Sequence, residues 1–120
     1  MARDDFDPEL TRGNLDLLVL SALRGGAKYG YLIQQSLGEG SGDRIRLTAG
    51  SLYPILHRLE AEGFVAARWD DETGRRRKWY ALTAAGRRQL TRRVAEWQAY
   101  VDCLRGLLAP LDATGGAATS

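Results

Sequence analysis

Hydrophobic residues recur at helical spacing along most of this 120-residue chain. Residues 10–23 are strongly apolar, and residues 27–37 and 48–64 each place apolar side chains on one helical face. Residues 64–82 differ, because β-prone segments flank the turn-forming sequence DDETG, which predicts an antiparallel hairpin. Helical spacing returns from Thr83 to about Leu108. The pattern therefore predicts three helices, a hairpin and a long last helix.

The stretch 48–64, TAGSLYPILHRLEAEGF, carries both a helix start signal and a helix stop signal. Thr48 can cap the first turn, and Gly63 can end the helix in a left-handed conformation. Pro54 lacks an amide proton and is expected within the first turns. The predicted core face consists of Leu52, Ile55, Leu56 and Leu59. The polar outer face suits either an ordinary surface helix or a helix that enters a DNA major groove.

The two segments before this helix predict further features. Residues 10–23 are apolar beyond one stripe, which indicates contact with more than one partner, including a second subunit. Gly30 falls inside the predicted helix 27–37, which indicates close packing against a neighbour. Residues 38–43, GEGSGD, are expected to form a loop. Residues 44–47 alternate polar and apolar side chains, as in a short strand.

The hairpin carries four consecutive cations, Arg75, Arg76, Arg77 and Lys78. Such a run is often only a solvated surface, but beside a basic helix it is also typical of a hairpin that contacts DNA. The aromatic residues Trp69, Trp79 and Tyr80 are expected to pack across the strands rather than to stack on bases.

The last helix has a heptad pattern, with apolar residues spaced alternately by four and three. The seam consists of Leu90, Val94, Trp97, Val101, Leu104 and Leu108. Because little of this chain is left to cover the seam, we expect a homodimer with two-fold symmetry.

Charge is segregated along the chain, although its net charge is only +2. Residues 44–93 hold twelve basic and five acidic side chains, whereas the segments on either side are net acidic. Concentrated basic charge favours binding to phosphates. We therefore expect a nucleic-acid partner.

Other classes of protein and site find little support. One His and one Cys, with no paired carboxylates near either, cannot make a catalytic constellation, so an enzyme is not expected. His57 has no further ligand at metal-binding spacing, and no cofactor is expected. Cys103 fits a buried structural thiol better than a reactive one. With no transmembrane-length apolar run and an acidic start unlike a signal peptide, we expect a cytoplasmic protein without membrane partners.

The order of elements is that of a winged helix-turn-helix, in which the third helix reads the groove and the hairpin reaches adjacent phosphates. The predicted fold class is mainly α with a small β-hairpin, plus a C-terminal dimerisation helix. Residues 1–82 would form the DNA-binding domain and residues 83–109 the dimerisation helix. Residues 1–9 are expected to fray, and residues 110–120 to form a disordered tail.

The stretch LTAGSLYPILHRLEAEGFV, followed by GRRRKWYALTAAGRRQL, strongly resembles the PadR family of bacterial transcriptional regulators. The segments GNLDLLVLSAL and KYGYLIQQ resemble that family's first two helices. The resemblance covers about residues 10–108 and points to the compact subgroup with a single long C-terminal helix. It implies a dimeric repressor that binds a palindromic site in double-stranded DNA and is released by a small ligand.

Carried over residue by residue, the resemblance implies DNA contacts from the second helix, the third helix and the hairpin. These residues are Tyr31, Thr48, Ser51, Tyr53, His57, Arg58, Arg75, Arg76, Arg77 and Lys78. Tyr29 matches a similar position, but core packing is the better interpretation for it.

The resemblance also implies a planar aromatic or drug-like effector at the dimer interface, beside Trp97. Candidates to line the same space are Leu15, Leu18, Val19 and Val101. The alternative is that Trp97 simply fills the dimer core.

A second hypothesis for the function of the chain also stays open. The chain could be a winged-helix protein-interaction module that no longer reads DNA, although its basic hairpin counts against this.

Overall fold

The structure is a computed structural model that describes residues 6–71, 74 and 76–109. The chain divides into two compact units, Met1–Leu90 and Thr91–Ser120. The predicted disordered tail, residues 110–120, lies outside the described residues.

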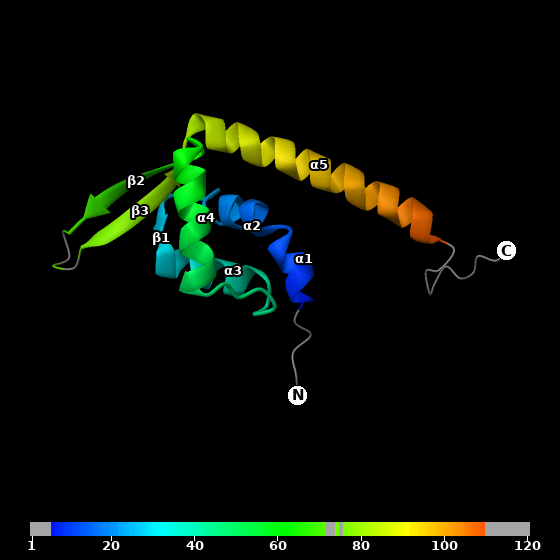
Figure 1. The fold of residues 1–120 in the computed structure, drawn as a ribbon, viewed down its shortest axis with the longest axis horizontal. Coiled ribbons are helices and arrows are strands. Elements are labelled where there is room, and N and C mark those ends of the chain that lie inside the picture. Colours follow the sequence, from blue (N-terminus) through cyan, green and yellow to red (C-terminus); the bar gives the residue numbers. More distant parts are fainter. Residues whose placement is uncertain (1–5, 72–73, 75, 110–120) are drawn as a thin grey trace. The chain divides into compact units, whose positions relative to one another are not determined.

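Within its described residues, the first unit contains four helices and three strands, together with the start of a long fifth helix that continues into the second unit (Figure 1). The elements are α1 (Pro8–Arg12), α2 (Leu15–Ala22), β1 (Lys28–Tyr29), α3 (Gly30–Gly40), α4 (Ala49–Ala61), β2 (Val65–Asp70), β3 (Arg77–Leu82) and α5 (Ala84–Leu108). The mainly helical winged-helix fold that was predicted is confirmed.

The core of the first unit lies where α2, α3 and α4 pack together beside the sheet (Figure 1). The four residues predicted as the core face of α4 are all buried there. The largest fully buried side chains are Tyr80, Leu20, Leu23, Ile33, Leu52, Leu56, Leu59 and Val19. The helices and the sheet thus share one apolar core, which holds α4 in place along its inner face.

The sheet has three antiparallel strands in the order β1-β3-β2. The hairpin places Arg68 opposite Trp79, and β1 adds to the free edge of β3 by pairing Tyr29 with Trp79. The predicted strand at residues 44–47 is wrong, since the short strand lies at Lys28–Tyr29 instead. The alternation in 44–47 reflects burial of Leu47, whose carbonyl accepts a hydrogen bond of 2.8 Å from the Gln34 side chain.

Two predicted helices have different limits in the structure. The segment 10–23 is not one helix, because α1 and α2 are separated at Gly13 and Asn14. Residues 1–9 were expected to fray. Residues 1–5 lie outside the described residues, but α1 starts at Pro8, where the Asp7 side chain accepts a 2.8 Å hydrogen bond from the Glu9 amide. The second predicted helix starts at Gly30 and continues to Gly40, so residues 38–40 are helix rather than loop.

The predicted ends of the third helix are confirmed. The Thr48 hydroxyl oxygen accepts a 3.1 Å hydrogen bond from the Ser51 amide, and Gly63 follows the helix with φ 83°. Thr83 likewise caps α5, accepting a 2.9 Å hydrogen bond from the Gly86 amide. The Thr83 hydroxyl also donates to the Gly63 carbonyl at 2.7 Å, so one side chain joins the end of α4 to the start of α5.

The second unit contains the rest of α5, from Thr91 to Leu108. Its surface is stabilised along the helix by Arg92 and Glu96, whose side chains approach to 2.8 Å. Within the described residues, no helix is both long and apolar enough to cross a membrane.

Candidate nucleic-acid interface

The exposed side of α4 is narrow and mostly built of small side chains. Successive residues turn by about 100° around a helix, so the positions opposite the buried face are Gly50, Pro54, His57 and Ala61. All four are exposed. His57 is the one large polar side chain among them, and the small neighbours would let the backbone of α4 approach a groove closely.

The start of α4 carries two hydroxyl groups. Thr48 is exposed, but its oxygen is engaged as the helix cap, and its hydroxyl donates to Ser51 Oγ at 3.3 Å. Ser51 is exposed on the first turn of the helix. Thr48 therefore orients the first turn, and Ser51 presents its hydroxyl at the surface.

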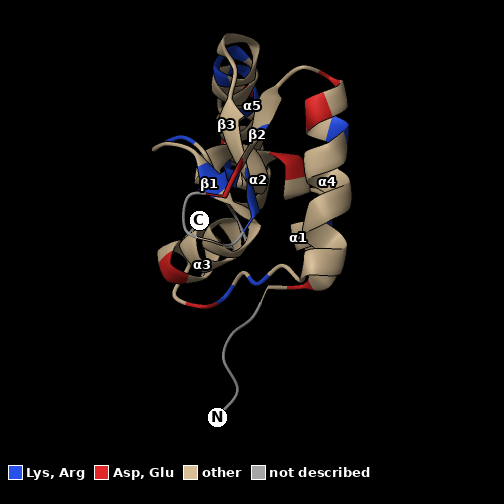
Figure 2. Cartoon of the chain, turned by 90° about the vertical axis from the view of Figure 1, so that its left-hand side faces the viewer, with Lys and Arg blue, Asp and Glu red and all other residues tan. Residues whose placement is uncertain are grey.

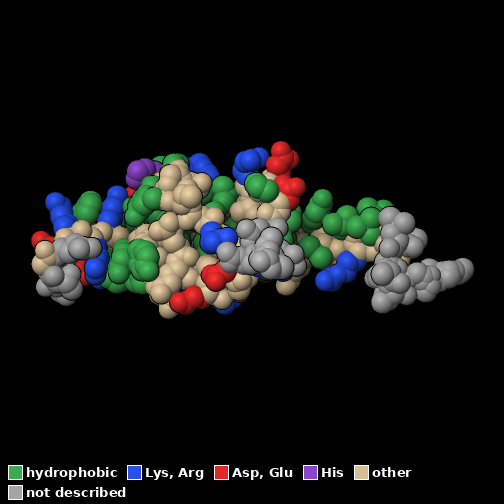
Figure 3. All heavy atoms as spheres, turned by 90° about the horizontal axis from the view of Figure 1, so that it is seen from below, with side chains coloured by type: hydrophobic (Ala, Val, Ile, Leu, Met, Phe, Trp, Pro, Cys, Tyr) green, Lys and Arg blue, Asp and Glu red, His purple; other side chains and the backbone are tan. Residues whose placement is uncertain are grey.

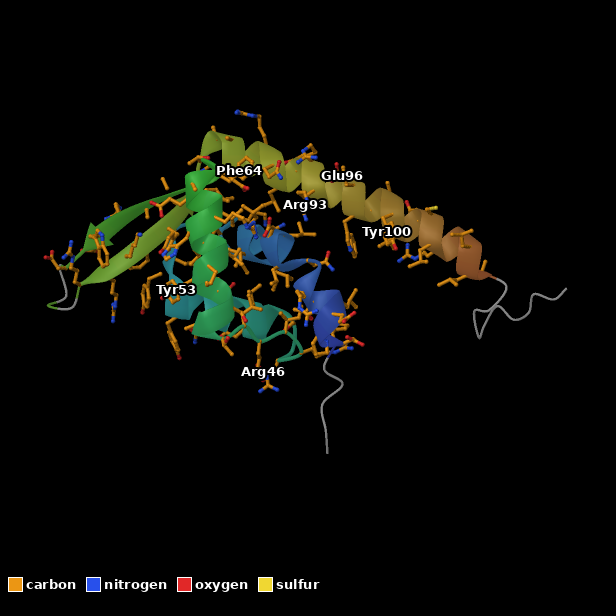
Figure 4. The ribbon with its side chains drawn as sticks, in the orientation of Figure 1. Arg46, Tyr53, Phe64, Arg93, Glu96 and Tyr100 are labelled. Atoms are coloured by element: carbon orange, nitrogen blue, oxygen red, sulfur yellow. The ribbon has the colours of Figure 1, made fainter. Side chains whose placement is uncertain are left out.

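Tyr53 lies on the flank of α4 that faces the sheet (Figure 4). Its ring end contacts Gly30, the first residue of α3, so closely that a Cβ atom at Gly30 would lie 2.7 Å from Tyr53 Cζ. The prediction that Gly30 packs closely is confirmed, although it starts a helix rather than lying inside one. Tyr31, one residue later, is 62% exposed.

Arg58 lies on the opposite flank of α4, toward α2. Its guanidinium is exposed, as expected, but it donates two hydrogen bonds to the Asp16 carboxylate, from Nη1 to Oδ2 at 3.0 Å and from Nη2 to Oδ1 at 2.5 Å. The helix pattern did not indicate this partner. Figure 2 shows how few charged positions α4 has, and Arg58 is its only arginine or lysine.

The cations of the hairpin lie against aromatic rings and one carboxylate. Arg76 lies over the Trp69 ring at 4.3 Å and Arg77 over the Tyr29 ring at 4.5 Å. Lys78 pairs with Glu60 of α4, with 3.6 Å between Nζ and Oε1. Arg75, the remaining predicted contact, lies outside the described residues.

Between α4 and the hairpin there is an open cavity of about 400 Å³. None of the residues that line it is acidic: they are Tyr29, Gly30, Tyr53, His57, Trp69, Arg76, Arg77, Lys78 and Tyr80. Trp79 shows the cross-strand packing expected of the hairpin aromatics, because its ring packs edge to face against the Tyr29 ring with 5.0 Å between the ring centroids.

Burial raises the pKa of the Tyr80 phenol, and the nearby Glu60 carboxylate raises it further. The face thus combines cations with aromatic surface.

Comparison with known proteins identifies the family. A model of the transcriptional regulator PadR-like family matches residues 19–92, which hold α3, α4 and the hairpin. The chain belongs to this family. An uncharacterised protein of Lysinibacillus sphaericus is 30% identical over 90 residues, covering 74% of this chain and 83% of its own. A transcriptional regulator of Mycobacterium tuberculosis, Rv3488, is 48% identical over 46 residues, covering 38% and 43%.

Comparison with solved structures supports the same family assignment. A PadR family transcriptional regulator from Eggerthella lenta superposes with a TM-score of 0.75 at 40% identity, covering 83% of this chain and 86% of its own. A transcriptional regulator from Clostridium thermocellum also gives a TM-score of 0.75, at 26% identity and coverage of 82% and 96%. This chain is therefore a PadR-family transcriptional regulator with a winged-helix fold, and its family is one of regulators rather than enzymes.

Within this PadR-family chain, one of the predicted seam residues, Leu90, is buried in the core of the first unit. In the second unit the remaining seam residues are exposed or half-buried, and Figure 3 shows hydrophobic side chains gathered toward the C-terminal end of α5. These residues are Val94, Trp97, Val101, Leu104 and Leu108. Cys103 is exposed, so the prediction of a buried thiol is wrong for the described chain.

The residues predicted to line an effector site fall in both units. Trp97, at 47% exposure, and Val101 lie in the second unit. Leu15 and Leu18 pack partly buried against the core of the first unit. Val19 is fully enclosed in that core.

Sequence reasoning missed several residues near the interface. Arg44 and Arg46 are exposed on the segment that leads into α4, and Arg46 points away from the helices (Figure 4). Arg44 lies over the Phe6 ring at 4.0 Å. Two cations directly before the third predicted helix were the available sequence signal. The partners Asp16 and Glu60 had no such signal, because each contacts its cation only through the fold.

Proposed function

We propose that this PadR-family regulator is a homodimeric repressor that binds a palindromic operator in double-stranded DNA. The observation that carries the proposal is the position of two features on one domain. Tyr53 and His57 of α4 line an open cavity together with Arg76, Arg77 and Lys78 of the hairpin, and none of the residues that line this cavity is acidic. The helix would read bases while Arg76, Arg77 and the residues before α4 hold phosphates.

The dimer part of the proposal rests on the apolar residues that α5 exposes in the second unit. Leucine, valine and tryptophan side chains at heptad spacing are typical of a helix that pairs with another helix. Two-fold symmetry would place two α4 helices in successive major grooves, roughly 34 Å apart. Repression follows if such a dimer covers the promoter of a neighbouring gene.

The effector part adds a planar aromatic ligand that relieves operator binding. Its support is Trp97, which exposes almost half of its surface in the middle of the apolar seam. Two Trp97 rings across a two-fold axis could hold a flat ring between them. Quenching of tryptophan fluorescence by planar aromatic compounds, abolished in Trp97→Phe, would measure this binding.

The DNA-binding proposal is tested by titrating the full chain onto duplexes from the region upstream of its own gene, at several salt concentrations. We expect sequence-preferring binding that weakens as salt rises, because phosphate contacts release counterions. The double variant Arg76→Ala/Arg77→Ala should lower the salt slope by about 1.8 for each subunit bound, since each phosphate that is no longer neutralised removes about 0.9 from the slope.

A matched control is Arg105→Ala, which removes a cation in the second unit, far along the chain from α4 and the hairpin. It should leave the slope unchanged. Binding that shows neither sequence preference nor salt dependence would rule out the repressor and favour a protein-interaction module.

A further inference from the structure

An ion pair between Asp16 and Arg58 links α2 to α4 in the first unit. It joins residues 42 positions apart in sequence, with two hydrogen bonds between one guanidinium and one carboxylate. Both terminal nitrogens of Arg58 are used. The fork that would otherwise contact a guanine or a phosphate in two places is therefore already engaged.

The pair also has a defined place in the fold. Asp16 lies in the first turn of α2 and Arg58 in the last turn of α4. An acidic residue at a helix start and a basic residue at a helix end each suit the helix dipole. Around α4, Arg58 is turned by about 100° from His57 at the centre of the outward face. The two hydrogen bonds between Arg58 and Asp16 thus link α4 to α2 beside the exposed face of α4.

The ion pair between Arg58 and Asp16 is expected to contribute little to the stability of the fold. The Arg58 and Asp16 side chains are 46% and 25% exposed, and ion pairs this exposed to solvent contribute little to stability. The position of α4 along the core is already held by the buried Leu52, Leu56 and Leu59. The two hydrogen bonds between Arg58 and Asp16 would in addition limit how far α4 can rotate about its own axis.

The pair also removes charge from the reading helix. Arg58 is the only arginine or lysine of α4, and Asp16 lies directly against it. On the other flank of α4, Glu60 is paired with Lys78 of the hairpin. Both charged residues of α4 are thereby matched by partners on other elements, and nonspecific attraction to phosphates is left to the hairpin and the residues before α4.

We propose that Asp16 is a specificity-determining positioning residue: it holds Arg58 off the DNA phosphates and sets the rotation of α4 in the groove. Arg58 in turn positions α4 rather than reading a base. This inference rests on the DNA-binding function proposed above. Asp16 would lower the affinity of the protein for nonspecific DNA and thereby increase its preference for the operator.

The first test is Asp16→Asn, which keeps the shape of the side chain and removes its charge. Affinity is measured for the operator and for a scrambled duplex of equal length, over a range of salt. Released Arg58 should add one phosphate contact in each subunit, which steepens the salt slope on scrambled DNA by about 0.9 per subunit. The ratio of operator to scrambled affinity should fall. An unchanged slope and ratio would overturn the inference.

The decisive test is a charge swap. Arg58→Asp alone should weaken operator binding, because two carboxylates then face each other. Adding Asp16→Arg restores an ion pair of the same combined length, and we expect operator affinity to return to within about threefold of wild type, which is less than 1 kcal/mol. If Arg58 reads the DNA directly, the double variant stays as weak as Arg58→Asp, and the inference is wrong.

Two controls separate the possible failures. Thermal unfolding of each variant shows whether it folds, and Arg58→Lys offers a milder change that keeps the charge but loses the fork. This variant should retain the salt slope and lose operator preference. If the wild type itself binds no DNA, the proposed function and this inference fail together. If the wild type binds and Asp16→Asn matches it in slope and ratio, only the inference fails.

Discussion

At the scale of single residues, the orientation of the exposed face of α4 depends on contacts that lie beside it. Thr48 uses its oxygen for the cap, Tyr53 packs against Gly30, and Arg58 is held by Asp16. His57 and Ser51 are exposed polar side chains of α4. The residues expected to contact DNA thus divide into side chains that face outward and side chains that orient the helix.

Gly30 gives a prediction at this scale. Gly30→Ala places a methyl group against the Tyr53 hydroxyl, so the tyrosine ring must move. We expect the free energy of unfolding to fall by about 1 kcal/mol, the lower end of the cost of overpacking, as measured by urea denaturation. In a Tyr53→Ala background the same change should cost nothing.

The matched control is Gly40→Ala at the other end of α3, where a Cβ meets no atom within 4 Å. It should be neutral or stabilising, since alanine favours a helix over glycine. Equal destabilisation by Gly30→Ala with and without Tyr53 would contradict the contact.

At the scale of elements, the hairpin is tied to the helices on both sides of its base. Thr83 bonds to the carbonyl of Gly63, and the amide of Thr83 donates to the carbonyl of Phe64 at 3.1 Å. Gly86 lies against this junction, where a Cβ would come within 2.9 Å of the Phe64 carbonyl carbon. The direction in which the hairpin leaves α4 is therefore set by backbone contacts at its base.

Gly86→Ala tests this junction. The obstacle is backbone rather than a flexible side chain, so the start of α5 has to shift, and we expect a loss of about 1–3 kcal/mol in thermal or urea unfolding. Gly106→Ala lies on the same helix with open space around it and should be neutral or stabilising by about 0.5–1 kcal/mol. A Gly86→Ala protein as stable as the Gly106→Ala protein would show that the junction has room.

At the scale of the whole molecule, the proposed repressor needs a second copy of the chain. The apolar surface of the second unit is long, because exposed hydrophobic residues continue from Val94 to Leu108. Such a surface on a single helix is costly to leave in water and is typical of an interface.

Trp97→Asp tests the dimer. A charge inside the helix pair would be buried without a partner, so we expect the variant to sediment as a monomer in analytical ultracentrifugation and to lose operator affinity. Ala99→Asp adds the same charge off the seam and should stay dimeric. A dimeric Trp97→Asp protein would show that the seam is not the interface.

Much of this protein follows from its sequence because local rules decide it. The apolar spacing identified the buried face of α4. Thr48 and Gly63 identified where α4 starts and ends, and Thr83 identified where α5 starts. The motifs were specific enough to indicate the PadR family, which the family match then showed.

Only the tertiary structure decided which partner each polar residue meets. Residues 28–29 become a strand rather than 44–47 because they pair with β3, whose position depends on the rest of the fold. Leu90 joins the core because the first turns of α5 pack there. The pairing of Arg58 with Asp16 follows from the packing of α2 against α4, and no spacing along the chain encodes a contact between residues so far apart.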